Sequence, residues 1–308
     1  MPVTVSPLFS PWGRFGLYSF FIDAEEPAIV DTGVASTVDG TVAELEKLGR
    51  RIEDVRWILL THGHIDHLGG AYALWERTGR RAKVVIHEAD LEYLRSRRAH
   101  VENYLDLRDR YIGNPDAEAE QTTMAENAIA GEMSAGVVLR GGESLSLGGG
   151  VSVTAHSIPG HTGGSVAYVI EGQNDVFVGD AVQIHGAANG FPGYEDPNAY
   201  RSSLEFLRDV VRPTRLFIGH PYRNSNGEPY DVALDADGAA QAISESLEIE
   251  ARIRAVAKSA IEKRLRETTS PYSPFEPVAA DLGYTGDPSL EPSPFFTTLD
   301  GYRRLFEG

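Results

Sequence analysis

The sequence predicts an α/β fold with two β-rich halves, helices on their outer sides, and further helical segments attached to this frame. Short runs rich in β-branched and aromatic residues alternate with amphipathic helical runs over about the first 90 residues, and strand-like runs return after residue 135. The run at residues 55–60 is almost continuously apolar, which is typical of a strand buried on both faces.

The first half begins with three short β-type runs, at residues 3–5, 15–22 and 28–30. The third run stops at Asp31, in the turn sequence Asp-Thr-Gly. A helix follows, in which apolar residues recur at helical spacing, before the strand at residues 55–60. Another helix and a strand at residues 83–86 complete a βαβ-like portion.

The pattern from about residue 87 to residue 135 is helical and charged. The later strands are expected at residues 136–140, 151–157, 165–170, 175–178 and 215–218, with a helix at 197–211. A long helix is expected at about 236–266, and the tail beyond residue 270 is rich in proline and aromatic residues.

Composition and charge narrow the classes of partner. The chain of 308 residues carries a formal net charge of −17, and its 28 Lys and Arg against 45 Asp and Glu argue against a nucleic-acid partner. It has no cysteine, so any metal must be held by imidazole and carboxylate groups. We find neither a signal-peptide pattern nor the roughly 20 apolar residues that span a bilayer, and we therefore expect a soluble, cytoplasmic protein with no membrane partner.

The strongest chemical signal is the motif His62-x-His64-x-Asp66-His67, which directly follows the strand expected at residues 55–60. His62 and His64 lie two residues apart at a strand end, so an extended backbone points both imidazoles to the same side. Asp66 and His67 follow in the loop that begins the next helix, close enough to serve a second ion. Imidazole and carboxylate are both zinc ligands, so the motif predicts a metal site.

Three more candidate ligands lie downstream. His161 lies in the turn Gly-His-Thr-Gly-Gly-Ser between two expected strands, Asp180 ends the run Phe-Val-Gly-Asp, and His220 ends the run Leu-Phe-Ile-Gly-His. Open α/β architectures gather ligands at one edge of the sheet in this way. Seven candidate ligands are too many for one Zn²⁺ with an open position, but they suit two ions about 3.5–4 Å apart.

These motifs resemble those of the metallo-β-lactamase superfamily and, within it, of the glyoxalase II-like hydrolases with a full two-metal set. The resemblance implies an αββα sandwich over residues 1–230, with a helical insertion at about 88–135 and a helical C-terminal extension over 231–308. It implies a first metal held by His62, His64 and His161, a second held by Asp66, His67 and His220, and a bridging Asp180. Asp31 matches a family position that supports the ligand loop from outside the ligand shell.

The implied reaction is hydrolysis of an ester-like bond of a small molecule, such as a lactone or a thioester, by a hydroxide that bridges two Zn²⁺ ions. Fe or Mn are the alternative metals. Coordination lowers the pKa of water to roughly 7, which provides the nucleophile near neutral pH. Besides the ligand Asp66, His185 and Tyr194 are candidate catalytic residues, because both follow Asp180 in the sequence and either could donate a hydrogen bond to an oxyanion.

Two other functions stay open on the ligands alone. The first is a signalling or ligand-binding protein that retains the metal site, since fold and site do not ensure turnover. The second is a mononuclear non-haem iron dioxygenase of the same fold. Hydrolysis of β-lactams is disfavoured, because the enzymes of this family that catalyse it generally lack an aspartate at the position of Asp180.

The insertion at residues 88–135 is long enough to lie over the ligand edge. Small-molecule sites need concave apolar walls, and the apolar residues of this segment include Tyr104 and Tyr111. We expect the insertion to roof a pocket for a moderately hydrophobic acyl group. The alternative is that this apolar stripe packs on a second subunit of a homodimer.

Overall fold

The computed structural model describes residues 2–13, 15–187, 190–290 and 293–307 of the chain. The first of its two six-stranded sheets has the order β1-β2-β3-β4-β5-β6. Its strands are β1 (Thr4–Trp12), β2 (Phe15–Asp23), β3 (Ala28–Val30), β4 (Trp57–Leu59), β5 (Lys83–His87) and β6 (Val137–Leu139). The pairs β1–β2 and β2–β3 are antiparallel and the three pairs from β3 to β6 are parallel, so β3, β4 and β5 end at the same edge.

The second sheet has the order β12-β11-β10-β9-β8-β7. Its strands are β7 (Ser144–Ser146), β8 (Ser152–Ser157), β9 (Val166–Ile170), β10 (Asp175–Phe177), β11 (Arg215–Phe217) and β12 (Ala233–Asp235). Only the pair β10–β11 is parallel among the described strands of this sheet. Because β12 lies beyond residue 230, the sandwich takes in residues that the sequence assigned to the C-terminal extension.

The two sheets pack face to face. Each sheet buries one side against the other sheet and its opposite side against helices. In β2, Phe20 and Ile22 point into the core between the sheets, and Phe21 points to the opposite side. In β9, Tyr168 lies between the sheets and Val169 belongs to the core on the outer side of the second sheet. Successive side chains of a strand point to opposite faces, and both faces are buried here. The central strands are therefore continuously apolar in sequence rather than alternating between apolar and polar residues.

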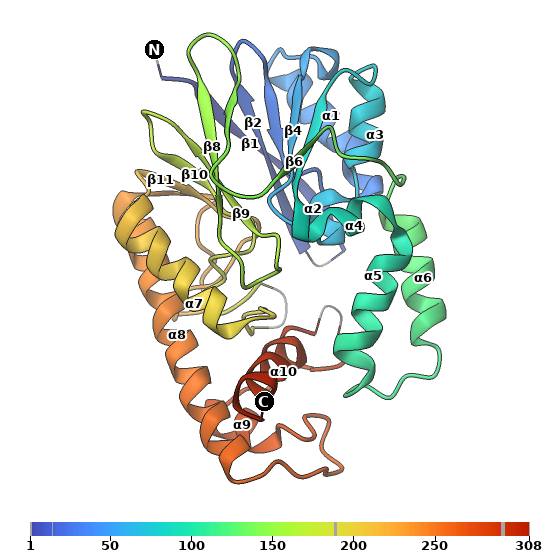
Figure 1. The fold of residues 1–308 in the computed structure, drawn as a ribbon, viewed down its shortest axis with the longest axis vertical. Helices are drawn as coiled ribbons and strands as arrows, with labels where there is room; N and C mark the ends of the chain where they lie inside the picture. Colours follow the sequence, from blue (N-terminus) through green and yellow to red (C-terminus); the bar gives the residue numbers. More distant parts are fainter. Residues whose placement is uncertain (1, 14, 188–189, 291–292, 308) are drawn as a thin grey trace.

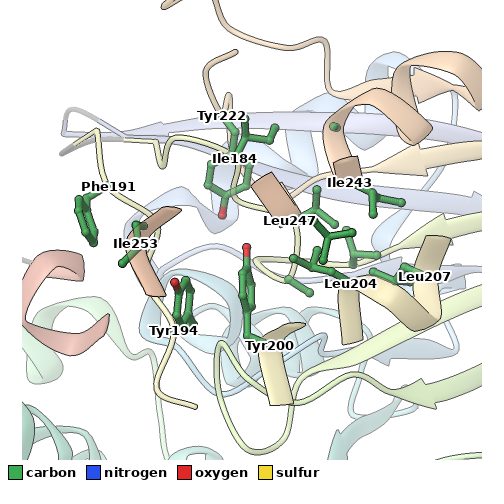
Figure 2. Close-up of a cluster of buried hydrophobic side chains, with 14 of the residues drawn as sticks. Ile184, Phe191, Tyr194, Tyr200, Leu204, Leu207, Tyr222, Ile243, Leu247 and Ile253 are labelled. Carbon is green, nitrogen blue, oxygen red and sulfur yellow. The ribbon is translucent and has the colours of Figure 1, made fainter. Parts of the chain in front are cut away.

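Helices cover the outer face of each sheet and complete the predicted αββα sandwich (Figure 1). The first sheet is flanked by η1 (Ala35–Thr37), α1 (Val38–Lys47), η2 (Ile52–Asp54), α2 (Ile65–Leu68) and α3 (Ala71–Arg77). The second is flanked by α7 (Pro197–Phe206), its π-helical continuation η5 (Leu207–Val211) and α8 (Ala236–Glu262). Figure 2 shows Leu204 and Leu207 lying against Ile243 and Leu247 of α8.

The insertion between β5 and β6 is helical, as predicted, and Figure 1 shows α5 and α6 side by side beyond the ends of the strands. It contains η3 (Glu88–Asp90), α4 (Leu91–Arg95), α5 (Arg97–Tyr104), the π-helical turn η4 (Leu105–Asp109) and α6 (Ala117–Ala128). It is tied to the C-terminal part of the chain at Asp300, whose carboxylate accepts hydrogen bonds from Tyr111 and Arg110 at 2.5 and 3.1 Å.

The helical C-terminal extension implied over 231–308 continues beyond α8 in two further helices. They are α9 (Glu276–Leu282) and α10 (Pro294–Glu307). Pro294 begins α10, where the amide donor that proline lacks has no partner in the helix. Phe295, Phe296 and Tyr302 are buried in the core shared with α7 and α8. Within the described part of the chain, no helix is long and apolar enough to cross a membrane.

Candidate metal centre

The seven predicted ligands meet at one edge of the sandwich. His62 and His64 follow β4, Asp66 and His67 lie in α2, and His161 lies in the loop between β8 and β9. Asp180 and His220 follow the parallel strands β10 and β11. Because the carboxyl ends of parallel strands face the same way, each sheet delivers its ligands to the same edge. The structure brings these seven side chains together in three overlapping groups of possible ligand atoms.

The first group consists of His62, His64 and His161, whose ligand atoms lie within 4.8 Å of one another. The Nε2 atoms of His62 and His161 are 3.2 Å apart. The Nδ1 atom of His161 donates to the carbonyl oxygen of Gly193 at 2.7 Å, so its Nε2 carries a lone pair. Ligands at about 2.0–2.1 Å from a tetrahedral Zn²⁺ are about 3.3 Å apart, and this spacing fits such an ion.

The second group consists of Asp66, His67 and His220. The Nε2 atoms of His67 and His220 are 3.2 Å apart, and Nε2 of His220 is 3.2 Å from Oδ2 of Asp66. The Nδ1 atom of His67 lies 2.9 Å from Oδ2 of Asp31, and that of His220 lies 2.9 Å from the carbonyl oxygen of Gly16. Both rings therefore turn their Nε2 atoms toward the same point, as metal-binding histidines do.

Asp180 lies between the two groups. Its Oδ1 atom is 3.2 Å from Nε2 of His67, and its Oδ2 atom is 3.3 Å from Nε2 of His220 and 3.7 Å from Nε2 of His161. The buried Oδ1 atom accepts no hydrogen bond of normal geometry from the described residues, although Nε2 of His67 lies 3.2 Å away. A buried carboxylate needs protonated neighbours or cations beside it, and the donor set fits a carboxylate shared by two ions.

Asp31 contacts the ligand His67 and the residue before His62 without being a ligand itself, as the resemblance implied. Its Oδ1 atom accepts from the backbone amide of Thr61 at 2.8 Å, and its Oδ2 atom accepts from the Thr61 hydroxyl at 2.7 Å as well as contacting His67. Asp31 has φ 56, a left-handed conformation that is uncommon for a residue other than glycine. Such strain persists where the surroundings fix the side chain, here through three contacts.

The backbone at Gly219 lies too close to the ligands to carry a side chain. A Cβ atom there would stand 2.5 Å from Oδ1 of Asp180 and 2.9 Å from Cε1 of His67. The glycine before His220 therefore lets the end of β11 pack directly against the metal ligands.

Electrostatics divide the histidines into two classes. Burial, assisted by neighbouring imidazoles, holds the pKa values of His62 and His64 well below the ordinary value. Burial, the largest single effect, would also lower the pKa of His67 and His220, but the neighbouring carboxylates, Asp180 foremost, together outweigh it. The pKa of His67 is raised well above its ordinary value, and that of His220 is raised to about 10. In the absence of metal, protons therefore occupy the second group at neutral pH and not the first.

A cavity of about 360 Å³ opens on the two groups. Its apolar and aromatic wall comes from Trp12, Ile65, Tyr104, Met124, Ala187, Phe191, Tyr222 and Pro294. The insertion contributes Tyr104 and Met124, so this segment lines the site as the sequence predicted. Tyr111 does not: its ring stacks on Phe296 at 5.1 Å and its hydroxyl bonds Asp300, so that part of the prediction is wrong.

Two of the predicted catalytic residues do not reach the cavity. The hydroxyl of Tyr194 lies 3.0 Å from that of Tyr302, and its ring stacks on Tyr200 in the outer core (Figure 2). His185 lies near charged groups of α8, because the amide of Ile184 bonds Ser246 of that helix and turns the loop away. Neither residue is among the described residues that line the cavity, so the geometry gives neither a contact with substrate.

Tyr222, which the predicted catalytic set did not include, does line the cavity. Its ring packs edge-on against His220, with centroids 5.7 Å apart. Burial and the carboxylate of Asp180 hold the pKa of its hydroxyl well above the ordinary value. Strand spacing could not have identified it, because the amide of Tyr222 bonds the carbonyl oxygen of His220 at 2.8 Å in a tight turn; the available signal is its closeness in sequence to a ligand.

Zinc binding to the metal-free protein should release protons unevenly from the two groups. At pH 7, below their raised pKa values, His67 and His220 are protonated, and a cation must displace those protons. His62 and His64 are already neutral. We expect on the order of two protons for the ion bound by the second group and fewer for the other. Calorimetric titration in buffers of different ionisation enthalpy measures both numbers, and equal release for the two ions would contradict the assignment.

A family model described as the metallo-beta-lactamase superfamily matches residues 12–220, a span that contains all seven ligands. The hydroxyacylglutathione hydrolase of Synechococcus sp. (strain JA-2-3B'a(2-13)) is 30% identical over 246 residues, which are 79% of this chain and 75% of that protein. The protein of the same name from Methylococcus capsulatus is 29% identical over 283 residues, which are 90% of this chain and 91% of that protein.

Solved structures with the same fold include a metallo-beta-lactamase family protein from Thermus thermophilus. It covers 98% of this chain and 93% of its own, with a TM-score of 0.70 and 20% identity. A B3 metallo-beta-lactamase with an active-site glutamic acid covers 86% of this chain and 93% of its own, with a TM-score of 0.56 and 23% identity. These two likenesses concern the fold alone. The match of the family model over most of the sandwich, together with the 30% identical relative, shows that this chain belongs to the metallo-beta-lactamase superfamily.

Proposed function

We propose that this chain is a dinuclear zinc hydrolase that cleaves the thioester, or a related ester-like bond, of a small acyl substrate. The observation that carries the proposal is the pair of ligand groups around Asp180 at the base of one cavity. The hydroxyacylglutathione hydrolases among its relatives support hydrolysis, and their name describes removal of an acyl group from glutathione. A thioester is therefore the first substrate class to test.

The ligands divide between two ions in this proposal. His62, His64 and His161 hold the first, Asp66, His67 and His220 hold the second, and Asp180 contacts both. When bound, the zinc ions lower the pKa of water to provide a nucleophile near neutral pH and polarise the acyl oxygen. Asp66 acts as a ligand, and its Oδ2 atom lies 3.2 Å from Nε2 of His220, the spacing of two atoms that share one ion, while the carbonyl oxygen of Gly16 holds that ring through Nδ1.

Tyr222 is the proton-bearing side chain that faces substrate in this proposal. Its raised pKa keeps the hydroxyl protonated at neutral pH, so that it can donate a hydrogen bond to an oxygen or sulfur atom on which negative charge develops. The hydroxyl is buried near Asp180 and therefore lies on the metal side of the cavity. The sequence analysis had suggested Tyr194 and His185 as the hydrogen-bond donors to an oxyanion.

The far walls of the cavity determine which acyl group fits. Ile65, Met124 and Phe191 provide apolar surface, and Tyr104 joins them from the end of α5. Arg108 is the only Lys or Arg among the described residues that line the cavity, and it is buried with its guanidinium over the ring of Tyr104 at 5.3 Å. The combination suits an acyl chain of moderate hydrophobicity that carries an anionic group.

Protein reconstituted with zinc should hydrolyse small acyl thioesters, and Asp180→Asn should abolish most of this activity. The variant loses the charge shared by the two ions, so we expect kcat to fall by more than the roughly 100-fold typical for a residue outside the ligand shell. Asp209→Asn, at an exposed carboxylate of η5, is the matched control and should behave as the wild type. A panel of thioesters, lactones and phosphodiesters provides the rates, and elemental analysis gives the metal content.

Two results of that experiment would contradict the proposal. One iron per chain in protein purified before zinc is added, with consumption of dioxygen, would make the protein a dioxygenase. Two zinc ions per chain, with tight binding of a panel compound but no turnover, would make it a ligand-binding protein.

Tyr104→Ala should raise KM for acyl substrates by about tenfold, which corresponds to about 1.4 kcal/mol of binding energy, while the metal content stays unchanged. The variant removes an aromatic wall from the cavity and touches none of the seven ligands. Tyr111→Phe is the control on the same insertion, because Tyr111 lies outside the cavity lining. Steady-state kinetics of both variants checks the prediction, and an unchanged KM in Tyr104→Ala would remove Tyr104 from substrate binding.

A further inference from the structure

Asp90 is a buried carboxylate that joins the two loops carrying the first group of ligands. It ends the short helix η3 after β5 and is 1% exposed. Its Oδ2 atom accepts from the backbone amide of Gly63 at 2.7 Å and from the hydroxyl of Thr162 at 2.7 Å. Its Oδ1 atom accepts from the backbone amide of Gly164 at 2.9 Å. Gly63 lies between His62 and His64, and Thr162 directly follows His161.

The two loops are shaped to fit this side chain. A Cβ atom at Gly63 would stand 2.4 Å from Cδ2 of Tyr93 and 2.9 Å from Cβ of Asp90, and one at Gly164 would stand 2.5 Å from Oδ1 of Asp90. Neither glycine has a positive φ, so neither is required there by its backbone conformation. The close approach of Asp90 is therefore a reason for glycine at both positions, on two loops that lie about 100 residues apart in sequence.

Both oxygen atoms of Asp90 must accept hydrogen bonds, because the three donors reach both of them. A carboxylate accepts through each oxygen, and hydrogen bonds to an ionised acceptor are stronger than neutral ones. An amide in its place would keep one acceptor and turn an N–H donor toward another donor. Asp90 is not among the described residues that line the cavity, so any effect on the reaction passes through the loops.

We propose that Asp90 is a positioning residue for the first metal site: it holds the loop of His62 and His64 at a fixed distance from the loop of His161. The inference rests on the proposed two-metal centre. The second site has a different support, because Asp31 contacts the ring of His67 directly, whereas the hydrogen bonds of Asp90 run to Gly63, Thr162 and Gly164. Asp31 also accepts from Thr61, whose hydroxyl lies 3.1 Å from Nδ1 of His62, so Asp31 supports both sites. The three bonds of Asp90 run to the two loops of the first site, so loss of Asp90 should affect the two ions unequally.

The test measures Zn²⁺ binding to the full-length, metal-free chain when only one site is intact. His220→Ala disables the second site and leaves the first, and His64→Ala does the reverse. Adding Asp90→Asn should weaken zinc binding on the order of 10- to 100-fold in the His220→Ala background and leave it unchanged in the His64→Ala background. Competition with a chromophoric chelator gives the affinities, and the absorption spectrum of bound Co²⁺ reports the ligand geometry of the remaining site.

Conservative variants distinguish loss of the positioning hydrogen bond from general destabilisation of the fold. Thr162→Ser keeps the hydroxyl that bonds Asp90 and should keep first-site affinity, whereas Thr162→Val removes that bond and should lower it. The Thr162 pair provides the same comparison if Asp90→Asn does not fold. Asp109→Asn, at an exposed carboxylate of the same insertion, should change neither site.

The results that would overturn the role of Asp90 differ from those that would overturn the two-metal centre. Equal weakening in both backgrounds, or none in either, would overturn the role of Asp90. A wild-type chain that binds a single zinc ion would instead refute the two-metal centre, whatever the variants do.

Discussion

The structure depends on one constraint, which is the convergence of lone pairs from imidazoles and carboxylates in a buried space. Two pairs of Nε2 atoms face each other at 3.2 Å, and the Nδ1 atoms of His161, His67 and His220 are occupied by oxygen atoms behind them. Such an arrangement is unfavourable without cations or protons between the rings. The surrounding fold holds the ligands in this arrangement. Asp31 contacts Thr61 and His67, and Asp90 contacts Gly63 and Thr162. Glycines such as Gly219 allow the strand ends to approach the ligands.

The sandwich and its additions perform separate tasks. The two sheets deliver the ligands through strand ends at one edge, while the insertion and α10 contribute cavity residues that the sheets do not provide. Asp300 of α10 binds Arg110 and Tyr111 of the insertion, so the two additions support each other across the chain. This separation allows the metal chemistry to stay constant while the cavity wall selects the substrate.

The ligand set was predictable because its signal is local: spacing within His62-x-His64-x-Asp66-His67 and single residues at strand ends. Two β-rich halves with helices outside them followed from the apolar runs, and the αββα arrangement followed from the family resemblance. Roles that depend on distant packing were not predictable, as for Tyr194, whose hydroxyl partner lies 108 residues away. The helical extension was predicted, but not the bounds of α9 and α10 within it, because α10 packs on α8 rather than following a local signal; β7 and β12 were missed because each is only three residues long. Asp90 was missed because its three partners come from two remote loops.

The central claim, that two metal ions share Asp180, is tested most directly by anomalous diffraction from crystals of the zinc-loaded protein. The account predicts two anomalous peaks about 3.5–4 Å apart, one among His62, His64 and His161 and the other among Asp66, His67 and His220. A single peak in protein saturated with zinc, or a second peak away from Asp180, would contradict it.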